Sequence, residues 1–389
     1  MITREEIRQL AQIESPSGCA ISFYFQPQRP QDKSHREEAI LIKDLVREAL
    51  RKAERNGQQQ ALRDDLQKVL QLAEGLHGNH SRGKVILACR DQGIWRSLDV
   101  APRLGRSQIL VNTRFHLRPL VAAQSGSPRT CVVLVDRQQA RIFELFEDTM
   151  TQKPDLEFGR LPKSGRSDGY LGYEAGHRER HIDKEIQTHF KQFAESLQML
   201  MNKDKFESIL IGCRDEAWSQ IEPQLHTYVK ERITGRFLVD PLAATPGEVR
   251  EHAQRILEKN RLARQNELIR EVIGQAQRNG RGATGLRHVL TALERQEVQT
   301  LVMEREFSAH GVECTNCRHL DTRMVRQCAV CGQETRELSD ISDSLVDLAL
   351  RNGADIHFVE VDAELEKVGK IGALLRFRAD QKTTQRVAV

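Results

Sequence analysis

The spacing of apolar residues over positions 1–125 predicts an α+β domain with a pair of helices. Thr3-x-x-Glu6 and Ser34-x-x-Glu37 are capping boxes, in which two side chains satisfy free backbone N–H groups at a helix start. The helix after Ser34 is predicted to run for about five turns. The second helix of the pair is predicted at residues 58–76. Three strands are predicted at residues 19–26, 84–90 and 93–98, and the last two are expected to form a hairpin.

Residues 128–245 alternate apolar strands with helices, which predicts a middle α/β domain. A small polar break at residues 124–128 separates it from the first domain. Such alternation is typical of a sheet that is covered on both faces. The strands are predicted at residues 130–136, 140–146, 208–213 and 237–239, and the helices at residues 182–201 and 218–231.

Residues 246–389 are predicted to form a long helix followed by a third domain. Thr245-x-x-Glu248 is another capping box, with Pro246 at the first helical position, where its missing N–H is not needed. The apolar stripe that follows lasts about eight turns, so we expect this helix to bridge the middle and last domains. The third domain is predicted to have helices at 282–293 and 344–352 and strands at 298–307, 354–361 and 371–378.

Four cysteines interrupt this third domain with a spacing typical of a structural zinc site. Cys314-x2-Cys317 and Cys328-x2-Cys331 each direct two thiolates to one point, and the ten residues between the pairs suit a short hairpin. Gly332 favours the turn after the second pair, whereas the residue after the first pair, Arg318, does not. Two disulfides or free thiols are the alternative, and they are less favoured in a cytosolic chain. We expect one structural zinc ion per chain, held by an insert at 312–335.

A glycine-rich stretch at residues 159–181 is the second region with candidate chemistry. It combines glycines and basic residues with two of the four tyrosines of the chain. Cations bind phosphates and rings stack on bases, so a mobile loop of this composition is typical of RNA binding, and a solvated surface loop is the alternative. The candidate RNA-binding residues are Arg166, Tyr170, Tyr173, His177, Arg178, Arg180 and His181.

Residues 280–378 resemble the C-terminal domain of the archaeo-eukaryotic class-1 release factor and Pelota family. The resemblance rests on the segment 282–293, the place of the cysteine pairs, and Gly369-Lys370-Ile371-Gly372 with the Leu-Arg-Phe-Arg strand at 375–378. It implies an L7Ae/L30e-like α/β/α sandwich that carries the zinc insert. The whole chain is then expected to be an α/β multidomain protein.

Release factors of this family carry a Gly-Gly-Gln loop at the position of residues 159–181, which enters the peptidyl-transferase centre. This chain has no such tripeptide, and no glutamine lies between Gln152 and Gln187. An Asn-Ile-Lys-Ser codon-reading motif is also absent from the first domain. The resemblance is therefore to Pelota-like members, among them the Balon type of ribosome hibernation factor in bacteria.

This resemblance implies a translation factor that contacts ribosomal RNA in the A site without peptide release, in hibernation or rescue. It also implies a translational GTPase, such as an elongation factor, as partner, and no catalytic residue. The alternative is an enzyme, a peptidyl-tRNA hydrolase or release factor for stalled ribosomes, because His177-x3-His181 with Glu179 and Asp183 offers a metal pair or an acid/base set. An L7Ae-like RNA adapter with no ribosomal role is a third interpretation.

The amino-acid composition does little to distinguish among these three candidate functions. With 39% apolar and 29% charged residues, the chain is ordinary for a soluble globular protein, and a net charge of +4 does not by itself indicate nucleic-acid binding. No apolar run approaches the roughly 20 residues that span a bilayer. We expect a cytoplasmic protein with no membrane partner. The other cysteines are expected to serve in packing: Cys19, Cys89, Cys131 and Cys213.

Overall fold

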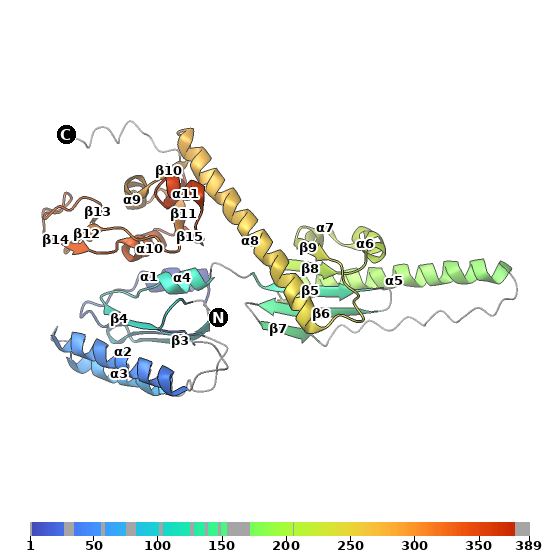
Figure 1. The fold of residues 1–389 in the computed structure, drawn as a ribbon, viewed down its shortest axis with the longest axis horizontal. Coiled ribbons are helices and arrows are strands. Elements are labelled where there is room, and N and C mark those ends of the chain that lie inside the picture. The colour runs from blue at the N-terminus through green and yellow to red at the C-terminus, as the bar shows by residue number, and fades with distance from the viewer. Residues whose placement is uncertain are drawn as a thin grey trace. The chain divides into compact units, whose positions relative to one another are not determined.

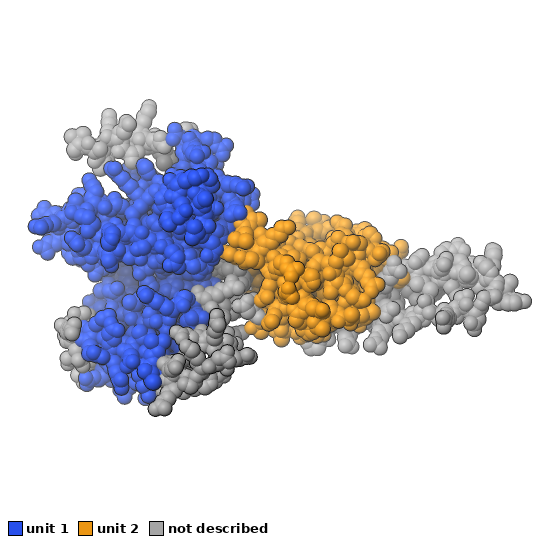
Figure 2. Space-filling model, in the orientation of Figure 1, with its two compact units in different colours: residues 1–125, 265–389 blue, residues 126–264 orange. Residues whose placement is uncertain are grey.

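The structure is a computed structural model, and its described part forms two compact units (Figure 2). Unit 1 combines residues 1–125 with residues 265–389, and unit 2 comprises residues 126–264. The division into three domains stays a prediction. The described residues are 2–26, 35–55, 59–74, 83–100, 104–124, 128–136, 139–146, 149–153, 172–204 and 206–377, without the side chains at 35–39, 53–55, 59–61, 73–74, 124, 172–183 and 185.

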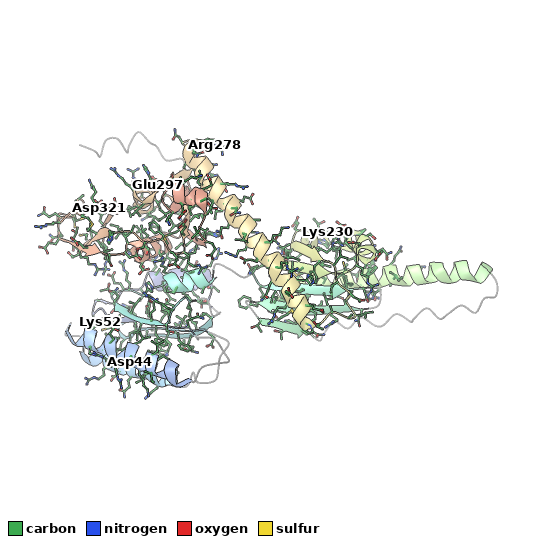
Figure 3. All side chains as sticks on the ribbon, in the orientation of Figure 1. Asp44, Lys52, Lys230, Arg278, Glu297 and Asp321 are labelled. Atoms are coloured by element: carbon green, nitrogen blue, oxygen red, sulfur yellow. The ribbon has the colours of Figure 1, made fainter. Side chains whose placement is uncertain are left out.

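The N-terminal part of unit 1 is a four-stranded antiparallel sheet with helices on both faces (Figure 1). Its elements are α1 (Arg4–Ala11), β1 (Ala20–Phe25), α2 (His35–Arg55), α3 (Gln59–Glu74), β2 (Gly83–Cys89), η1 (Arg90–Gln92), β3 (Ile94–Val100), β4 (Gln108–Asn112) and α4 (Arg118–Gln124). The strand order is β3-β2-β1-β4. Phe23 and Ile86 pack under α2 and α3, while Tyr24 and Leu87 share a core with α1 and α4. Charged residues such as Asp44 on α2 point away from the sheet (Figure 3).

Most predictions for this part are confirmed. The Thr3 N–H donates to Glu6 Oε2 at 2.7 Å and the Glu6 N–H donates to Thr3 Oγ1 at 3.1 Å, so the first capping box forms. Ser34 lies outside the described residues. The elements β4 and α4 were not predicted, because five and seven residues are too few to display a clear period.

The C-terminal part of unit 1 is a four-stranded sheet in the order β10-β16-β11-β15, with a small three-stranded sheet, β13-β12-β14, inserted after β11. Only β11 and β15 are parallel. Helices α9 and α10 contribute to the core on one face, and α11 to the core on the other. The elements are β10 (Gly282–Thr284), α9 (Leu286–Glu294), β11 (Val298–Glu304), β12 (Gly311–Cys314), β13 (Leu320–Asp321), β14 (Thr335–Leu338), α10 (Ser342–Arg351), β15 (Asp355–Val359), α11 (Ala363–Lys367) and β16 (Ile371–Leu375).

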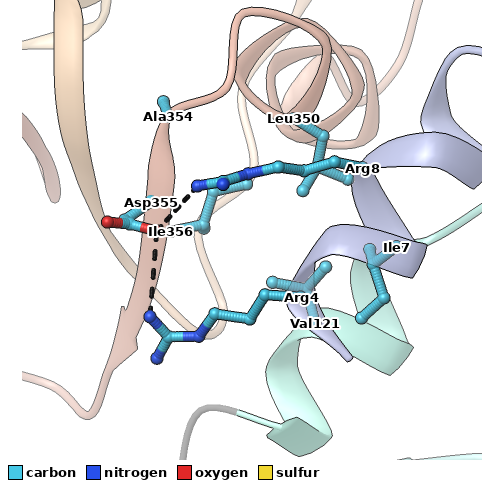
Figure 4. A pocket seen from close by; sticks show the side chains of 8 residues that line it. All are labelled: Arg4, Ile7, Arg8, Val121, Leu350, Ala354, Asp355 and Ile356. Atoms are coloured by element: carbon cyan, nitrogen blue, oxygen red, sulfur yellow. Dashed lines mark hydrogen bonds and ion pairs between the residues drawn. The ribbon is translucent and has the colours of Figure 1, made fainter. Parts of the chain in front are cut away.

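The two parts of unit 1 share one apolar core and an ionic seam. Ile7 and Leu120 from the N-terminal part belong to the same buried cluster as Leu345 on α10. Arg4 and Arg8, one turn apart on α1, both point at Asp355 on β15, at 3.7 Å and 2.9 Å (Figure 4). The two ends of the chain therefore form one body, which the sequence did not indicate.

Unit 2 is a five-stranded sheet in the order β7-β6-β5-β8-β9, in which β5, β8 and β9 are parallel. Phe190 on α5 packs with α6 and α7 on one face, and Val249 and Ala253 on α8 pack on the other, so the predicted double cover is confirmed. The elements are β5 (Thr130–Val135), β6 (Ala140–Phe146), β7 (Thr149–Lys153), α5 (Gly172–Asp204), β8 (Ser208–Gly212), α6 (Asp215–Ile221), η2 (Glu222–Gln224), α7 (Thr227–Lys230), β9 (Ile233–Phe237) and α8 (Pro246–Gln277).

Helix α8 begins in unit 2 and ends in unit 1. Its capping box forms, with the Thr245 N–H 2.9 Å from Glu248 Oε2 and the Glu248 N–H 3.3 Å from Thr245 Oγ1. Toward its end, Val272 packs into the C-terminal sheet of unit 1. Among the described residues, no helix combines the length and apolar character needed to cross a membrane.

Two predicted boundaries in unit 2 are wrong. Strand β9 ends at Phe237, where the predicted strand began. Helix α5 begins at Gly172, so the predicted loop at 159–181 overlaps its first ten residues. Gly172 and Gly176 suggested a loop, but the glutamate, alanine and arginine residues around them are good helix formers, and a helix already nucleated extends at little cost.

Candidate metal centre and the start of helix α5

The four cysteine sulfurs of the insert lie within 4.8 Å of one another. The Sγ atoms of Cys314 and Cys331 are 3.4 Å apart, and those of Cys317 and Cys328 are 3.5 Å apart. Zinc–sulfur bonds of about 2.3 Å in a tetrahedron put the sulfurs about 3.8 Å apart. The cluster therefore has the size and donor set for one tetrahedral metal ion.

The two Cys-x2-Cys turns, here called the first and second knuckle, have the same backbone hydrogen bonds. In each, the first cysteine donates its N–H to the carbonyl five residues later, at 2.9 Å and 2.8 Å, and its own carbonyl accepts the N–H four residues later, at 3.1 Å and 2.9 Å. Arg318 and Gly332 fill that fourth position with φ of 61° and 73°. Arg318 thus adopts the left-handed conformation for which only Gly332 appeared suited.

Backbone N–H groups point at the sulfurs. Asn316 and Cys317 both donate to Cys314 Sγ at 3.4 Å, and Val330 donates to Cys328 Sγ at 3.4 Å. Such bonds favour a thiolate over a thiol, and the thiolate is the form that binds metal. The backbone therefore prepares this cluster for a cation.

The thiols also compete for ionisation. The Gln333 N–H, followed by the Cys314 thiol, lowers the pKa of Cys331 to about 6. At Cys317 the His319 N–H lowers the pKa, but burial and the neighbouring thiols outweigh it and raise the pKa to about 12. Four thiols this close cannot all ionise unless a positive ion balances their charge. A cluster of four cysteine sulfurs therefore suits a bound metal cation.

Polar contacts fix the insert to the rest of unit 1. Ile341 donates its N–H to the Ala309 carbonyl at 2.8 Å, which closes the base of the insert. Glu294, the last residue of α9, lies 2.5 Å from His319 Nδ1 and accepts the Leu320 N–H at 3.3 Å. Burial raises the pKa of Glu294. The first knuckle is thereby held to the end of α9.

The structure does not bring the predicted RNA-binding residues into a described site. Arg166 and Tyr170 lie outside the described residues. The other five fall on the helical backbone of α5, and their side chains are outside the described part: Tyr173, His177, Arg178, Arg180 and His181. Their role stays a prediction.

Sequence reasoning missed the ionic seam between the two ends of the chain. Arg118 donates to the carbonyls of Arg305 and Phe307 at 2.9 Å and 3.1 Å, and Arg114 pairs with Asp347 at 2.7 Å. The sequence feature that could have indicated the seam is a pair of arginines four residues apart, Arg114 and Arg118, together with a pair of aspartates four residues apart on α10, Asp343 and Asp347. A single sequence does not show that such distant pairs meet.

Comparison with known proteins finds sequence matches to release factors. Residues 116–258 match the model of Bacterial archaeo-eukaryotic release factor family 10. Peptide chain release factor subunit 1 of Archaeoglobus fulgidus is 24% identical over 290 residues, which cover 69% of this chain and 70% of that protein. The same factor of Pyrococcus abyssi is 25% identical over 240 residues, 53% of this chain and 57% of that protein.

Solved structures give matches of low TM-score. A structure of ribosome-bound archaeal Pelota and ABCE1 has a TM-score of 0.42 at 16% identity, covering 97% of this chain and 95% of the other. The crystal structure of Archaeoglobus fulgidus Pelota has a TM-score of 0.35 at 14% identity, covering 97% and 93%. Because these scores are below 0.5, the assignment rests on the sequence matches. By those matches, residues 116–258 resemble the bacterial archaeo-eukaryotic release factors, and a larger part of the chain is similar to archaeal peptide chain release factor subunit 1.

Proposed function

We propose that the protein is a Pelota-like translation factor that occupies the ribosomal A site without releasing the nascent peptide. One observation carries the proposal: this chain, which resembles the family, lacks the Gly-Gly-Gln tripeptide between β7 and α5. No glutamine occurs between Gln152 and Gln187. The segment therefore has no glutamine side chain to place a water against the peptidyl-tRNA ester. Occupancy without hydrolysis suits a role in ribosome hibernation, as in the Balon type, or in rescue.

The proposed contact with ribosomal RNA runs from the glycine-rich stretch into the first turns of α5. The first buried side chain described on α5 is Ile186, so positions 173–181 precede the packed part of the helix. Cations there would bind phosphates, and tyrosines would stack on bases. The proposed residues are Arg166, Tyr170, Tyr173, His177, Arg178, Arg180 and His181.

We further propose that the four-cysteine site holds one zinc ion with a structural role. Cys314, Cys317, Cys328 and Cys331 supply four thiolates, which would fill a tetrahedral shell and leave no position for a substrate or water. The ion would supply charge balance and crosslinking rather than reaction chemistry. The C-terminal sheet that carries the insert would be the L7Ae-like domain of the family.

Two further properties are proposed from the resemblance to this family. A translational GTPase such as an elongation factor is the proposed delivery partner, since release factors and Pelota act with one. The cytoplasm is the proposed location, because the ribosome is the proposed target.

Binding and peptide release are tested in the same reaction. Ribosomes that hold labelled peptidyl-tRNA are mixed with saturating protein, sedimented, and assayed for bound protein and free peptide. We expect co-sedimentation, competition with aminoacyl-tRNA, and intact peptidyl-tRNA. Failure to co-sediment would reject the ribosomal role in favour of an RNA adapter.

Charge substitutions on α5 locate the contact. The double variant Arg178→Ala/Arg180→Ala is expected to bind ribosomes more weakly and with a shallower salt dependence, because each lost phosphate contact removes about one unit of the salt slope. The matched control is Lys191→Ala/Lys203→Ala, two exposed lysines further along the same helix. Equal loss in both variants would indicate nonspecific charge attraction.

The tyrosines are tested in the same way. Tyr170→Ala/Tyr173→Ala is expected to weaken sedimentation with little change in melting temperature, since stacking is worth about 1 to 3 kcal/mol per base. The exposed Met199→Ala on α5 serves as control. Unchanged ribosome binding would remove these residues from the proposed contact.

A hydrolase is the second candidate, and the helical start of α5 is the observation in its favour. On a helix, positions 177 and 181 are one turn apart, which is the spacing of a two-histidine metal or acid/base pair. Peptide release above background that disappears in His177→Ala or His181→Ala would establish the hydrolase. If the unmodified protein releases no peptide above background, the hydrolase is rejected.

A further inference from the structure

One side chain of the first knuckle leaves the insert and binds the N-terminal part of the chain. Arg318 Nη2 lies 2.5 Å from Glu14 Oε1 and donates to Thr113 Oγ1 at 3.2 Å. The Arg318 side chain is only 26% exposed. The contact therefore joins the four-cysteine site to residues that lie 304 and 205 positions earlier in the chain.

The Arg318 contact is the first link of an alternating chain of charges. The second Glu14 oxygen lies 3.4 Å from Arg114 Nη2, and Arg114 Nη1 lies 2.7 Å from Asp347 Oδ2 on α10. The Ser15 N–H donates to the Thr113 carbonyl at 2.8 Å, so the two N-terminal segments that receive Arg318 are themselves bonded. A displacement of Arg318 would remove a support shared by both segments.

The position of Arg318 depends on the knuckle. Its φ of 61° is unfavourable for a residue with a Cβ, so the surrounding structure must enforce it. The enforcing bonds are those of the knuckle, in which the Arg318 N–H donates to the Cys314 carbonyl at 3.1 Å. Loss of the metal would free Cys314 and with it the backbone that aims the guanidinium.

We propose that metal binding and docking of the N-terminal part are coupled through Arg318, so that the knuckle acts as a metal-dependent latch between the two ends of the chain. The inference rests on the proposed metal centre. It predicts reciprocity: if the metal favours docking, then docking favours the metal by the same factor.

Zinc affinity of the full-length protein, measured by competition with a chromophoric chelator, tests this reciprocity. Glu14→Gln, about three hundred positions from the four cysteines of the insert, is expected to weaken zinc binding roughly fivefold. Arg318→Gly is expected to do the same, because glycine tolerates the knuckle geometry and only the side chain is lost. The double variant should lose no more than either single variant. Arg323→Ala removes an arginine that pairs inside the insert with Asp321, and should leave the affinity unchanged.

Hydrogen exchange gives a readout that does not depend on affinity. Stripping zinc from the parent should accelerate exchange of the Ser15 amide, which donates to the Thr113 carbonyl, whereas in Arg318→Gly this exchange should already be fast and respond little to chelation. A parent that binds zinc with an affinity equal to that of Glu14→Gln overturns the latch alone. A parent that binds no zinc overturns the metal centre and the latch with it.

Discussion

The insert and unit 2 obtain their stability from different sources. In unit 2, large side chains such as Phe143, Phe190 and Phe193 are fully buried between sheet and helices. In the insert, residues 311–338, the buried apolar side chains are Val312, Cys314, Leu320 and Cys328, two of which belong to the thiol cluster. So small a core cannot offset the entropy of ordering the segment, whereas that of unit 2 can. The comparison leads us to expect that the insert would depend on the proposed zinc ion for its stability and that unit 2 would not.

Removing one thiolate should have the largest effect. Cys314→Ser or Cys331→Ser is expected to lose zinc and unfold the insert, because zinc supplies folding free energy on the order of 10 kcal/mol in zinc-finger peptides. Metal analysis together with hydrogen exchange of residues 311–338 and 206–237 measures this. The buried Cys19→Ala should keep the metal. A metal-free protein with unchanged exchange in the insert would contradict the comparison.

A cavity in unit 2 should have the opposite effect: it should destabilise unit 2 without changing the zinc content of the insert. Phe190→Ala is expected to destabilise unit 2 by about 3 to 5 kcal/mol, as for other buried phenylalanines, while the zinc content stays at one per chain. Denaturant unfolding followed by exchange of β5 and β8 measures the change. Met199→Ala, 65% exposed on the same helix, should cost less than about 0.5 kcal/mol. Loss of zinc in Phe190→Ala would show that the two regions are not independent.

The seam of unit 1 represents a third source of stability, which is polar and involves neither metal nor a large cavity. Arg118→Ala removes donors to two backbone carbonyls and to Ser342 Oγ from a side chain that is 18% exposed. We expect unit 1 to lose about 1.5 to 3 kcal/mol, the range for hydrogen bonds to charged groups. The free energy of unfolding of unit 1 is the measurement. Arg47→Ala, on an exposed ion pair of α2, should change it by less than about 1 kcal/mol.

Acid should act weakly on both units. Burial lowers the pKa of His116 and His357 in unit 1 and of His189 in unit 2. Since the unfolded chain takes up protons near pH 6.5 that the folded chain does not, this stability is present above about pH 6.5 and is lost as the pH falls toward the folded pKa values. Urea midpoints at pH 7.5 and 5.5 should show the loss, and His357→Gln should reduce it for unit 1. The same pH response in His357→Gln and in the exposed-site control His310→Gln would exclude a contribution from His357.

Local patterns in the sequence predicted much of this architecture. Strands β5, β6 and β8 lie within one residue of their predicted ends, because continuous apolar runs specify buried strands. The cysteine spacing identified the cluster because the knuckle is a local structure. The seam could not be predicted, since Arg118 meets Phe307 across 189 positions of sequence. The sequence pattern does not show the start of α5, because Gly172 and Gly176 favour a loop whereas the helix formers around them continue the helix.

The composition of unit 1 from both ends of the chain has a consequence for synthesis. Residues 126–264 are complete, and unit 2 can form its sheet, while the partner strands β11, β15 and β16 of unit 1 have not yet been translated. Domains fold as units while the chain emerges. The N-terminal part must therefore wait, with the surface of α1 and α4 that will pack on α10 still exposed to solvent, until the last strand leaves the exit tunnel. Nascent chains that are stalled before residue 342 should bind, through that surface, chaperones that recognise exposed apolar surface. Completed chains should not bind them.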